Sequence, residues 1–177
     1  MTAAIAEHPY SLPQQEKWYA VVTRYRCETK VCTSLQQAGL TVFLPLLQQI
    51  HRWSDRNKRV AVPLFAGYLF VCVQWSPSAR LMVLRTPGVM RFVEFGPETA
   101  PIPTQQIEHL KLLLSQGIHC SLRAFLNVGQ HVRIRGGCLD GLEGILEHNG
   151  DKSLVISIES IQRSIAIHIE NYELELI

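Results

Sequence analysis

The chain has 177 residues, a hydrophobic fraction of 47%, a charged fraction of 18% and a formal net charge of +2. These values describe a globular protein with room for one ordinary domain or two small ones. Its apolar runs fall short of the roughly 18 residues that a membrane-spanning helix needs, and its first sixteen residues lack the features of a secretory signal. We therefore expect a cytoplasmic protein with no membrane segment and a flexible tail at 1–16.

Charge is unevenly distributed along the chain. Residues 1–115 hold 12 Lys and Arg and 7 Asp and Glu, a net +5, whereas residues 116–177 hold 5 and 8, a net −3. This asymmetry indicates two modules with different partners. The five cysteines form no CxxC pair and the histidines do not occur at metal-ligand spacing, so we expect no disulfide, metal or cofactor.

The first 116 residues alternate between strand and helix patterns. In chain order, we predict a strand at 17–23, a helix ending at Gly39, a strand at 41–47, a hairpin or protruding loop at 48–62, a strand at 67–75, a short helix at 77–84, a strand at 89–95, and a helix that Thr104 caps and Gly117 ends. This order favours an α+β sandwich, with helices packed on one face of a small sheet.

The strand at 67–75 is apolar on both faces. Its side chains alternate, with Tyr68, Phe70 and Cys72 on one face and Leu69, Val71 and Val73 on the other. Strands of this kind are normally buried on both sides. The aromatic face must be covered either by the protein's own helices or by a partner protein, and the small number of predicted helices keeps the partner as an alternative.

Beyond a linker at 117–126, the pattern changes to short strands of period two. Apolar residues alternate through 132–134, 154–158 and 165–169, with glycine-containing turns between some of these segments. Several short strands at close intervals predict a small β-barrel of the SH3-like kind.

Two stretches carry a resemblance to a known family. VGQHVRIRGGCLDGLEGIL, at 128–146, is similar to a KOW motif, in which Gly129, Gly136, Gly137, Gly141 and Gly144 permit tight turns. KWYAVV, FLPL, PLFAGYLFV and TPGVMRFVEFG resemble, in order, the segments of a NusG N-terminal domain. The resemblance implies an N-terminal domain at 17–116 and a KOW domain at 127–177. The TPGV segment and the end of the KOW region look closer to specialised paralogues, the RfaH, UpxY and LoaP groups.

The resemblance implies a protein that does no chemistry. The N-terminal domain of this family binds the clamp helices of the RNA polymerase beta-prime subunit and steadies the elongating enzyme against pausing. The positions implied for this contact are Tyr19, Phe43, Pro45, Pro63, Phe65, Gly67, Tyr68, Phe70 and Thr86. The alternative is that Phe70 and about half of these residues are simply sheet core.

The family also implies contact with upstream DNA and the exposed non-template strand. The matching basic and aromatic positions are Arg24, Arg26, Arg52, Trp53, Arg56, Lys58 and Arg59. Lys and Arg can contact phosphates, and Trp53 can either stack on a base or anchor its loop. The alternative is a solvated, charged loop.

The KOW domain implies a further partner, either a small-subunit ribosomal protein or the Rho terminator. We expect a monomer that acts as an operon-specific antiterminator. The alternatives are a housekeeping NusG and an RNA-binding or ribosome-associated KOW protein. An enzyme is the least favoured class, because no nucleophile elbow, P-loop or dinucleotide fingerprint is present. The sequence leaves open whether the two modules touch.

Overall fold

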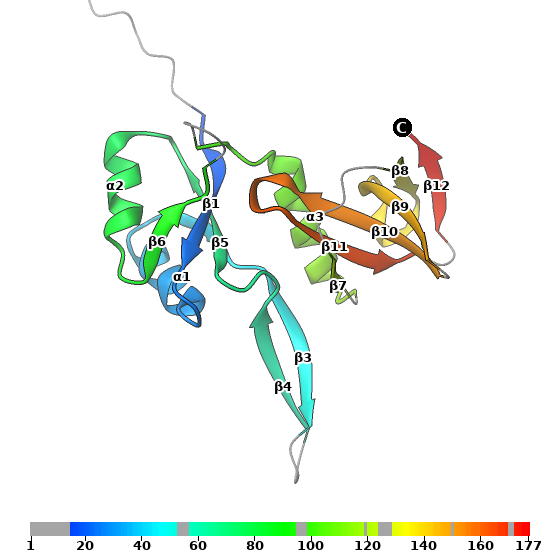
Figure 1. The fold of residues 1–177 in the computed structure, drawn as a ribbon, viewed down its shortest axis with the longest axis horizontal. Coiled ribbons are helices and arrows are strands. Elements are labelled where there is room, and N and C mark those ends of the chain that lie inside the picture. Colours follow the sequence, from blue (N-terminus) through cyan, green and yellow to red (C-terminus); the bar gives the residue numbers. More distant parts are fainter. Residues whose placement is uncertain are drawn as a thin grey trace, which may run out of the picture.

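The computed structural model describes residues 15–52, 57–94, 99–118, 120–123, 129–149, 151–169 and 172–177. Two modules follow one another along the chain (Figure 1). The first consists of β1 (Lys17–Thr23), α1 (Glu28–Gln37), β2 (Thr41–Phe43), β3 (Leu46–Arg52), β4 (Asn57–Pro63), β5 (Tyr68–Val73), α2 (Pro77–Arg85), β6 (Val89–Phe92) and α3 (Thr104–Ser115). The second consists of β7 (Cys120–Arg123), β8 (Gln130–Arg135), η1 (Gly137–Leu139), β9 (Glu143–Asn149), β10 (Asp151–Ile158), η2 (Glu159–Ile161), β11 (Arg163–His168) and β12 (Glu173–Leu176). This mixture is the predicted α+β fold.

The first module is built on a four-stranded antiparallel sheet in the order β2-β5-β1-β6. The hairpin β3–β4 forms a separate two-stranded sheet and projects away from the rest of the molecule, as predicted (Figure 1). The strand predicted at 41–47 is divided between β2 and β3, with Pro45 in the gap. Proline has no N–H to donate to a ladder, which suits a break in strand pairing at this point.

The helix ends follow local sequence signals only in part. Ser76 caps α2, because its Oγ accepts a hydrogen bond of 3.1 Å from the Ala79 N–H, and Pro77 occupies the first turn of this helix, which was predicted at 77–84. Thr104 is not the cap of α3. Pro103 holds that position, and no side chain caps this end of the helix.

The alternation predicted for β5 holds, and the two faces of the sheet pack differently. On one face, Leu69 and Val71 of β5 share a core with Val31 and Leu35 of α1 and Val83 of α2. On the other face, Phe70 shares a core with α3 and with the second module. Burying one side chain of this size stabilises the fold by about 1.5–3 kcal/mol.

The second module is a six-stranded antiparallel sheet in the order β12-β8-β9-β10-β11-β7. It is compatible with the predicted KOW barrel. Strand β7 lies inside the segment predicted to be a linker, because Cys120–Arg123 pairs with β11. Within the described part of this module, four glycines have positive φ, as predicted for turns: Gly129, Gly136, Gly137 and Gly141.

Gly144 has a different role from the turn predicted for it. It lies within β9, and a Cβ there would come within 2.6 Å of the Val155 carbonyl oxygen of the neighbouring strand. The residue is therefore glycine because two backbones approach closely.

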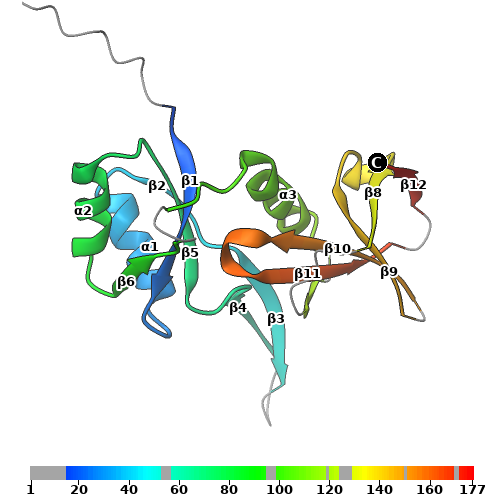
Figure 2. The same ribbon diagram turned by 45° about the horizontal axis from the view of Figure 1, so that its top comes forward.

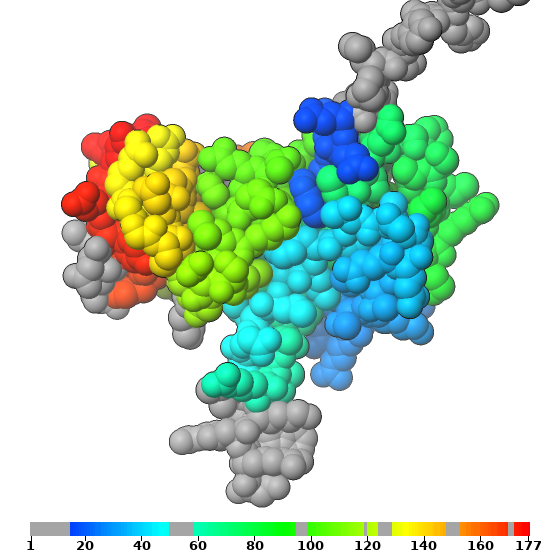
Figure 3. All heavy atoms as spheres, turned by 180° about the vertical axis from the view of Figure 1, so that it is seen from behind, coloured from blue at the N-terminus to red at the C-terminus, as the bar shows by residue number. Residues whose placement is uncertain are grey.

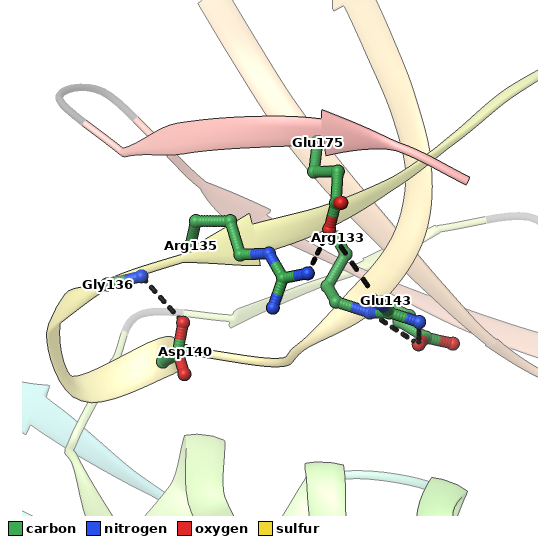
Figure 4. Close-up of polar contacts among 6 residues, drawn as sticks. All are labelled: Arg133, Arg135, Gly136, Asp140, Glu143 and Glu175. Carbon is green, nitrogen blue, oxygen red and sulfur yellow. Dashed lines mark hydrogen bonds and ion pairs between the residues drawn. The ribbon is translucent and has the colours of Figure 1, made fainter.

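Ion pairs join three neighbouring strands across the surface of this sheet (Figure 4). Arg133 of β8 lies between Glu143 of β9 and Glu175 of β12, with its Nη2 2.6 Å from Glu143 Oε1 and its Nη1 3.7 Å from Glu175 Oε2. Arg135 also contacts Glu175. In the adjoining turn, the Gly136 N–H donates to Asp140 Oδ1 over 2.7 Å. Together these contacts support the register of β12, β8 and β9.

Candidate functional site

Four aromatic side chains predicted to bind a partner lie on one face of the first sheet. Phe43, Phe65, Tyr68 and Phe70, here called the aromatic face, all belong to or pack against a single apolar cluster. The Phe43 and Phe70 rings stack with centroids 6.1 Å apart, and Phe65 meets Phe70 edge-on at 6.4 Å. Such geometries add to the stability gained by burial alone.

The turn that positions Phe65 and Tyr68 is anchored to α1. Gly67 has a φ of +82°, and its N–H donates a 2.7 Å hydrogen bond to Glu28 Oε1. The Gly67 carbonyl in turn accepts from the Thr23 N–H at 2.8 Å. Glu28 is only 4% exposed and sits in the first turn of α1, where a negative charge is favourable. Glu28 was not among the residues predicted from the sequence. Its one signal was an acid at the start of a helix.

Helix α3 covers part of the aromatic face. Its buried side chains Ile107, Leu110 and Leu113 join the same apolar cluster. Lys111 adds a cation contact, because its Nζ lies 4.9 Å from the centre of the Trp18 ring and 5.8 Å from that of Phe43.

The second module completes the cover. Side chains of β10, η2 and β11, including Ile158, Ile161 and Ile165, belong to the cluster that contains Phe65 and Phe70. In Figures 1 and 2, the turn joining β10 to β11 points toward the first sheet. From behind, α3 fills the space between the two modules (Figure 3). Within this cluster, Phe65 is only 2% exposed. Of the two alternatives for covering this face, the structure has the chain's own elements.

Other residues predicted for the same contact lie elsewhere. Tyr19 points to the opposite face, where its ring packs 4.6 Å from that of Trp75. Thr86 is the C-cap residue of α2 and lines a pocket together with Ser34 of α1 and Leu81 of α2. Pro45 and Pro63 flank the base of the β3–β4 hairpin, where the Leu64 N–H donates to the Pro45 carbonyl at 2.8 Å. The structure thus brings together four of the predicted side chains and leaves Tyr19 and Thr86 apart from them.

The residues predicted to contact nucleic acid fall into two regions. Arg24 and Arg26 are exposed in the turn between β1 and α1, and Arg59 is exposed on β4. Arg52 and Lys58 lie on the hairpin strands, but their side chains are not among those described. Trp53 and Arg56 lie outside the described residues.

A cleft of about 330 Å³ separates part of α3 from the second module. His109 of α3 lines it opposite Glu143 of β9, together with His131 and Glu159. Burial lowers the pKa of His109, and the Glu143 carboxylate opposes that shift.

Within the described ranges, no group of three or more His, Cys, Asp or Glu residues could hold a metal ion. No helix in the described part of the chain is long and apolar enough to cross a membrane.

The sheet, its three helices and the second module place the chain in a known class. A family model described as "Transcription termination factor nusG" matches residues 16–111, more than half of the chain, and the protein belongs to the NusG family. It is 27% identical over 170 residues to the transcription termination/antitermination protein NusG of Lactococcus lactis subsp. lactis (strain IL1403), covering 89% of this chain and 91% of that protein. It is 25% identical over 173 residues to the NusG of Staphylococcus carnosus (strain TM300), covering 90% and 95%.

A solved structure gives the same result for the fold. The structure titled "Domain interaction in Thermotoga maritima NusG" superposes with a TM-score of 0.56, at 20% identity, over 90% of this chain and 97% of that one. The first module carries the family match, and the α+β fold over both modules agrees with this structure.

Proposed function

We propose that this protein is a transcription elongation and antitermination factor that acts by binding RNA polymerase and not by catalysis. The observation that carries the proposal is the aromatic face, which lies in the module that matches the NusG family. Phe43, Phe65, Tyr68 and Phe70 offer a helical pair a large apolar area, and apolar burial contributes about 25 cal/mol per Å² before ordering costs. The beta-prime clamp helices are the partner we propose for it. A cytoplasmic site of action accompanies this role.

Binding at this face requires the second module to leave. Phe65 and Phe70 are buried in one cluster with residues of β10, η2 and β11, so polymerase helices and the second module compete for the same rings. A factor of this kind binds polymerase in its open form, and its apparent affinity is reduced by the fraction of molecules that are closed.

Elongation on a pause-rich template tests the proposal. We expect the full chain to shorten pauses, and Phe65→Ala with Tyr68→Ala to abolish polymerase binding while circular dichroism stays native. Because Phe65 is buried, Tyr68→Ala alone serves as a milder second variant. Loss of the fold in both variants would support the reading of these rings as sheet core.

The competition has its own test. Ile161→Asp places a charge in η2, at a buried side chain of the cluster that extends over both modules, and is expected to raise polymerase affinity by opening the molecule. Leu122→Asp is the matched control, because Leu122 is exposed on β7. Equal polymerase affinity for Ile161→Asp and the unmodified chain would count against a closed, competing state.

We further propose that the protein is operon-specific, with a housekeeping NusG as the alternative. The resemblance of the TPGV segment to specialised paralogues favours the first, and the similarity to ordinary NusG proteins over about nine tenths of the chain suits the second. Deleting the gene distinguishes them: an operon-specific factor changes the transcripts of one long operon, whereas a housekeeping factor changes transcription broadly.

The second module is proposed to recruit a small-subunit ribosomal protein or Rho, with upstream and non-template DNA as further contacts of the first module. The second module lies in residues 116–177, whose net charge of −3 suits a basic ribosomal partner. Binding of the purified full chain to each candidate, measured side by side, decides between them. An RNA-binding protein without a polymerase partner would instead be indicated by a pull-down that lacks beta-prime.

A further inference from the structure

The turn between β1 and α1 presents an exposed aromatic ring between two arginines. Tyr25 is 72% exposed, the highest value among the large hydrophobic side chains that the structure describes as exposed. Arg24 and Arg26 on either side are exposed as well. The guanidinium carbon of Arg26 lies 5.2 Å from the centre of the Tyr25 ring, within cation–π distance. An aromatic side chain is thus held in water beside two cations.

The backbone of this turn is fixed by hydrogen bonds. The Arg24 N–H donates to the Gly88 carbonyl at 2.8 Å, and the Cys27 N–H donates to the Arg24 carbonyl at 3.0 Å. Arg26 adopts a φ of +62°, a left-handed conformation that is uncommon for a residue with a side chain. Tyr25 is therefore presented by a defined turn, so little ordering is needed when a ligand binds.

The charge around the ring selects the class of ligand. Glu28 is the only acid between residues 23 and 31, and it is buried and bonded to Gly67. Lys30 on α1 and Arg91 on the neighbouring strand β6 are exposed cations. This end of the sheet is consequently positive, which favours a polyanion.

A polyanion that also offers a flat apolar surface is a single-stranded nucleic acid. Unpaired bases stack on exposed aromatic rings regardless of sequence, whereas the bases of a duplex are already stacked on one another. We propose that the Arg24–Tyr25–Arg26 turn binds single-stranded nucleic acid, with one base stacked on Tyr25 and the flanking phosphates contacted by Arg24 and Arg26. This inference rests on the nucleic-acid contact proposed for the two arginines and assigns the base to Tyr25.

Direct binding of the full chain to labelled oligonucleotides tests this inference without polymerase. Fluorescence anisotropy with short oligothymidine and oligouridine measures stacking on DNA and RNA separately, and inorganic polyphosphate, a polyanion without bases, is the competitor. Tyr25→Ala is expected to weaken oligonucleotide binding about ten-fold, the effect of losing one stacked base, and to leave polyphosphate competition unchanged. Tyr25→Phe keeps the ring and is expected to bind normally.

Two further variants separate ring from charge. Arg24→Ala is expected to weaken both oligonucleotide and polyphosphate binding and to lower the salt dependence by about 0.7 in the log–log slope, the value for one lost single-strand phosphate contact. Met90→Ala, at another exposed apolar side chain, is the control and should change nothing.

Equal oligonucleotide binding by Tyr25→Ala and the unmodified chain overturns the proposal. It is also overturned if Tyr25→Ala weakens polyphosphate binding as much as oligonucleotide binding, or lowers affinity only for polymerase, which would make the ring a protein contact. If the unmodified chain shortens pauses but binds no oligonucleotide, the stacking proposal fails and the proposed function stands.

Discussion

The two faces of the first sheet are buried by different means. Leu69 and Val71 of β5 are covered by α1 and α2, which are close to that strand in the sequence. Phe70, between them on the same strand, is covered by α3 and by strands that begin about eighty residues later. One face is therefore a core formed by neighbouring elements, and the other is closed in part by the second module, which we propose a partner can replace. The following predictions test that difference, from the largest expected effect to the smallest.

Leu35→Ala should have the largest effect on stability. Leu35 is fully buried between α1 and the sheet, and truncating such a leucine costs about 2–5 kcal/mol in the free energy of unfolding. Denaturant titration measures it. Leu81→Ala, at an exposed site on α2, should cost far less. A small loss for Leu35→Ala would mean that the helix-covered face is not a tightly packed core.

Glu28→Ala should cost about 1.5–3 kcal/mol, because it removes a charged partner and leaves the Gly67 N–H unsatisfied. Hydrogen exchange at the Gly67 amide is expected to speed up, since the turn that carries Phe65 loses its anchor. Glu28→Gln keeps an acceptor and should lose less. Unchanged exchange at Gly67 in Glu28→Ala would show that the anchor is unimportant, and the two faces would then be independent at this turn.

Gly144→Ala should destabilise the second module by about 1–3 kcal/mol, the usual effect of forcing atoms into a packed site. Because that module closes the aromatic face, an apolar dye is expected to bind the variant more strongly. Gly141→Asn is the control, since open space surrounds Gly141 and asparagine tolerates its positive φ. Increased dye binding in the control alone would contradict this prediction.

Acidification should weaken the closure of the modules. Burial lowers the pKa of His109 in the closed form, so protonation favours the open form. The contribution of His109 to the free energy of closure is then fully present above the ordinary histidine pKa of about 6.5. It decreases as the pH falls below that value, and it stops changing below the lowered pKa. Glu143, His131 and Glu159 line the same cleft as His109. Distance measurements between labelled modules across this range, compared with His109→Gln, check the effect. The same pH dependence in that variant would assign it to the neighbouring groups.

Sequence reasoning predicted what depends on local pattern. The alternation along β5 was correct because strand side chains have a period of two. The helix predicted at 77–84 was found as α2, and its start is set by Ser76 and Pro77 because capping is a local interaction. The family resemblance was also carried by short ordered segments, and the match at 16–111 confirms it.

What the sequence did not predict depends on contacts between distant segments. Nothing in the apolar character of Phe65 indicates that it shares a buried cluster with residues near 161. Tyr19 lies on the opposite face from Phe70 because β1 pairs it with Val71 of β5, a register that the sequence alone does not give. The short strand β7 has no alternation of apolar and polar residues that would predict it from the sequence. It forms a strand because it pairs with β11. From the sequence alone, a glycine such as Gly144 is consistent both with a turn and with a close approach of two backbones. Only the position of the neighbouring strand distinguishes the two roles.

The pairing of β7 with β11 also limits how far the modules can separate. Because α3 ends at Ser115 and β7 begins at Cys120, the covalent tether between them spans five Cα steps and reaches at most about 18 Å. While β7 stays paired, a released module remains at a high effective concentration near its old position. Any competitor for the aromatic rings must therefore bind faster than the tethered second module rebinds them. The time for which the competitor stays bound depends on keeping the two modules apart.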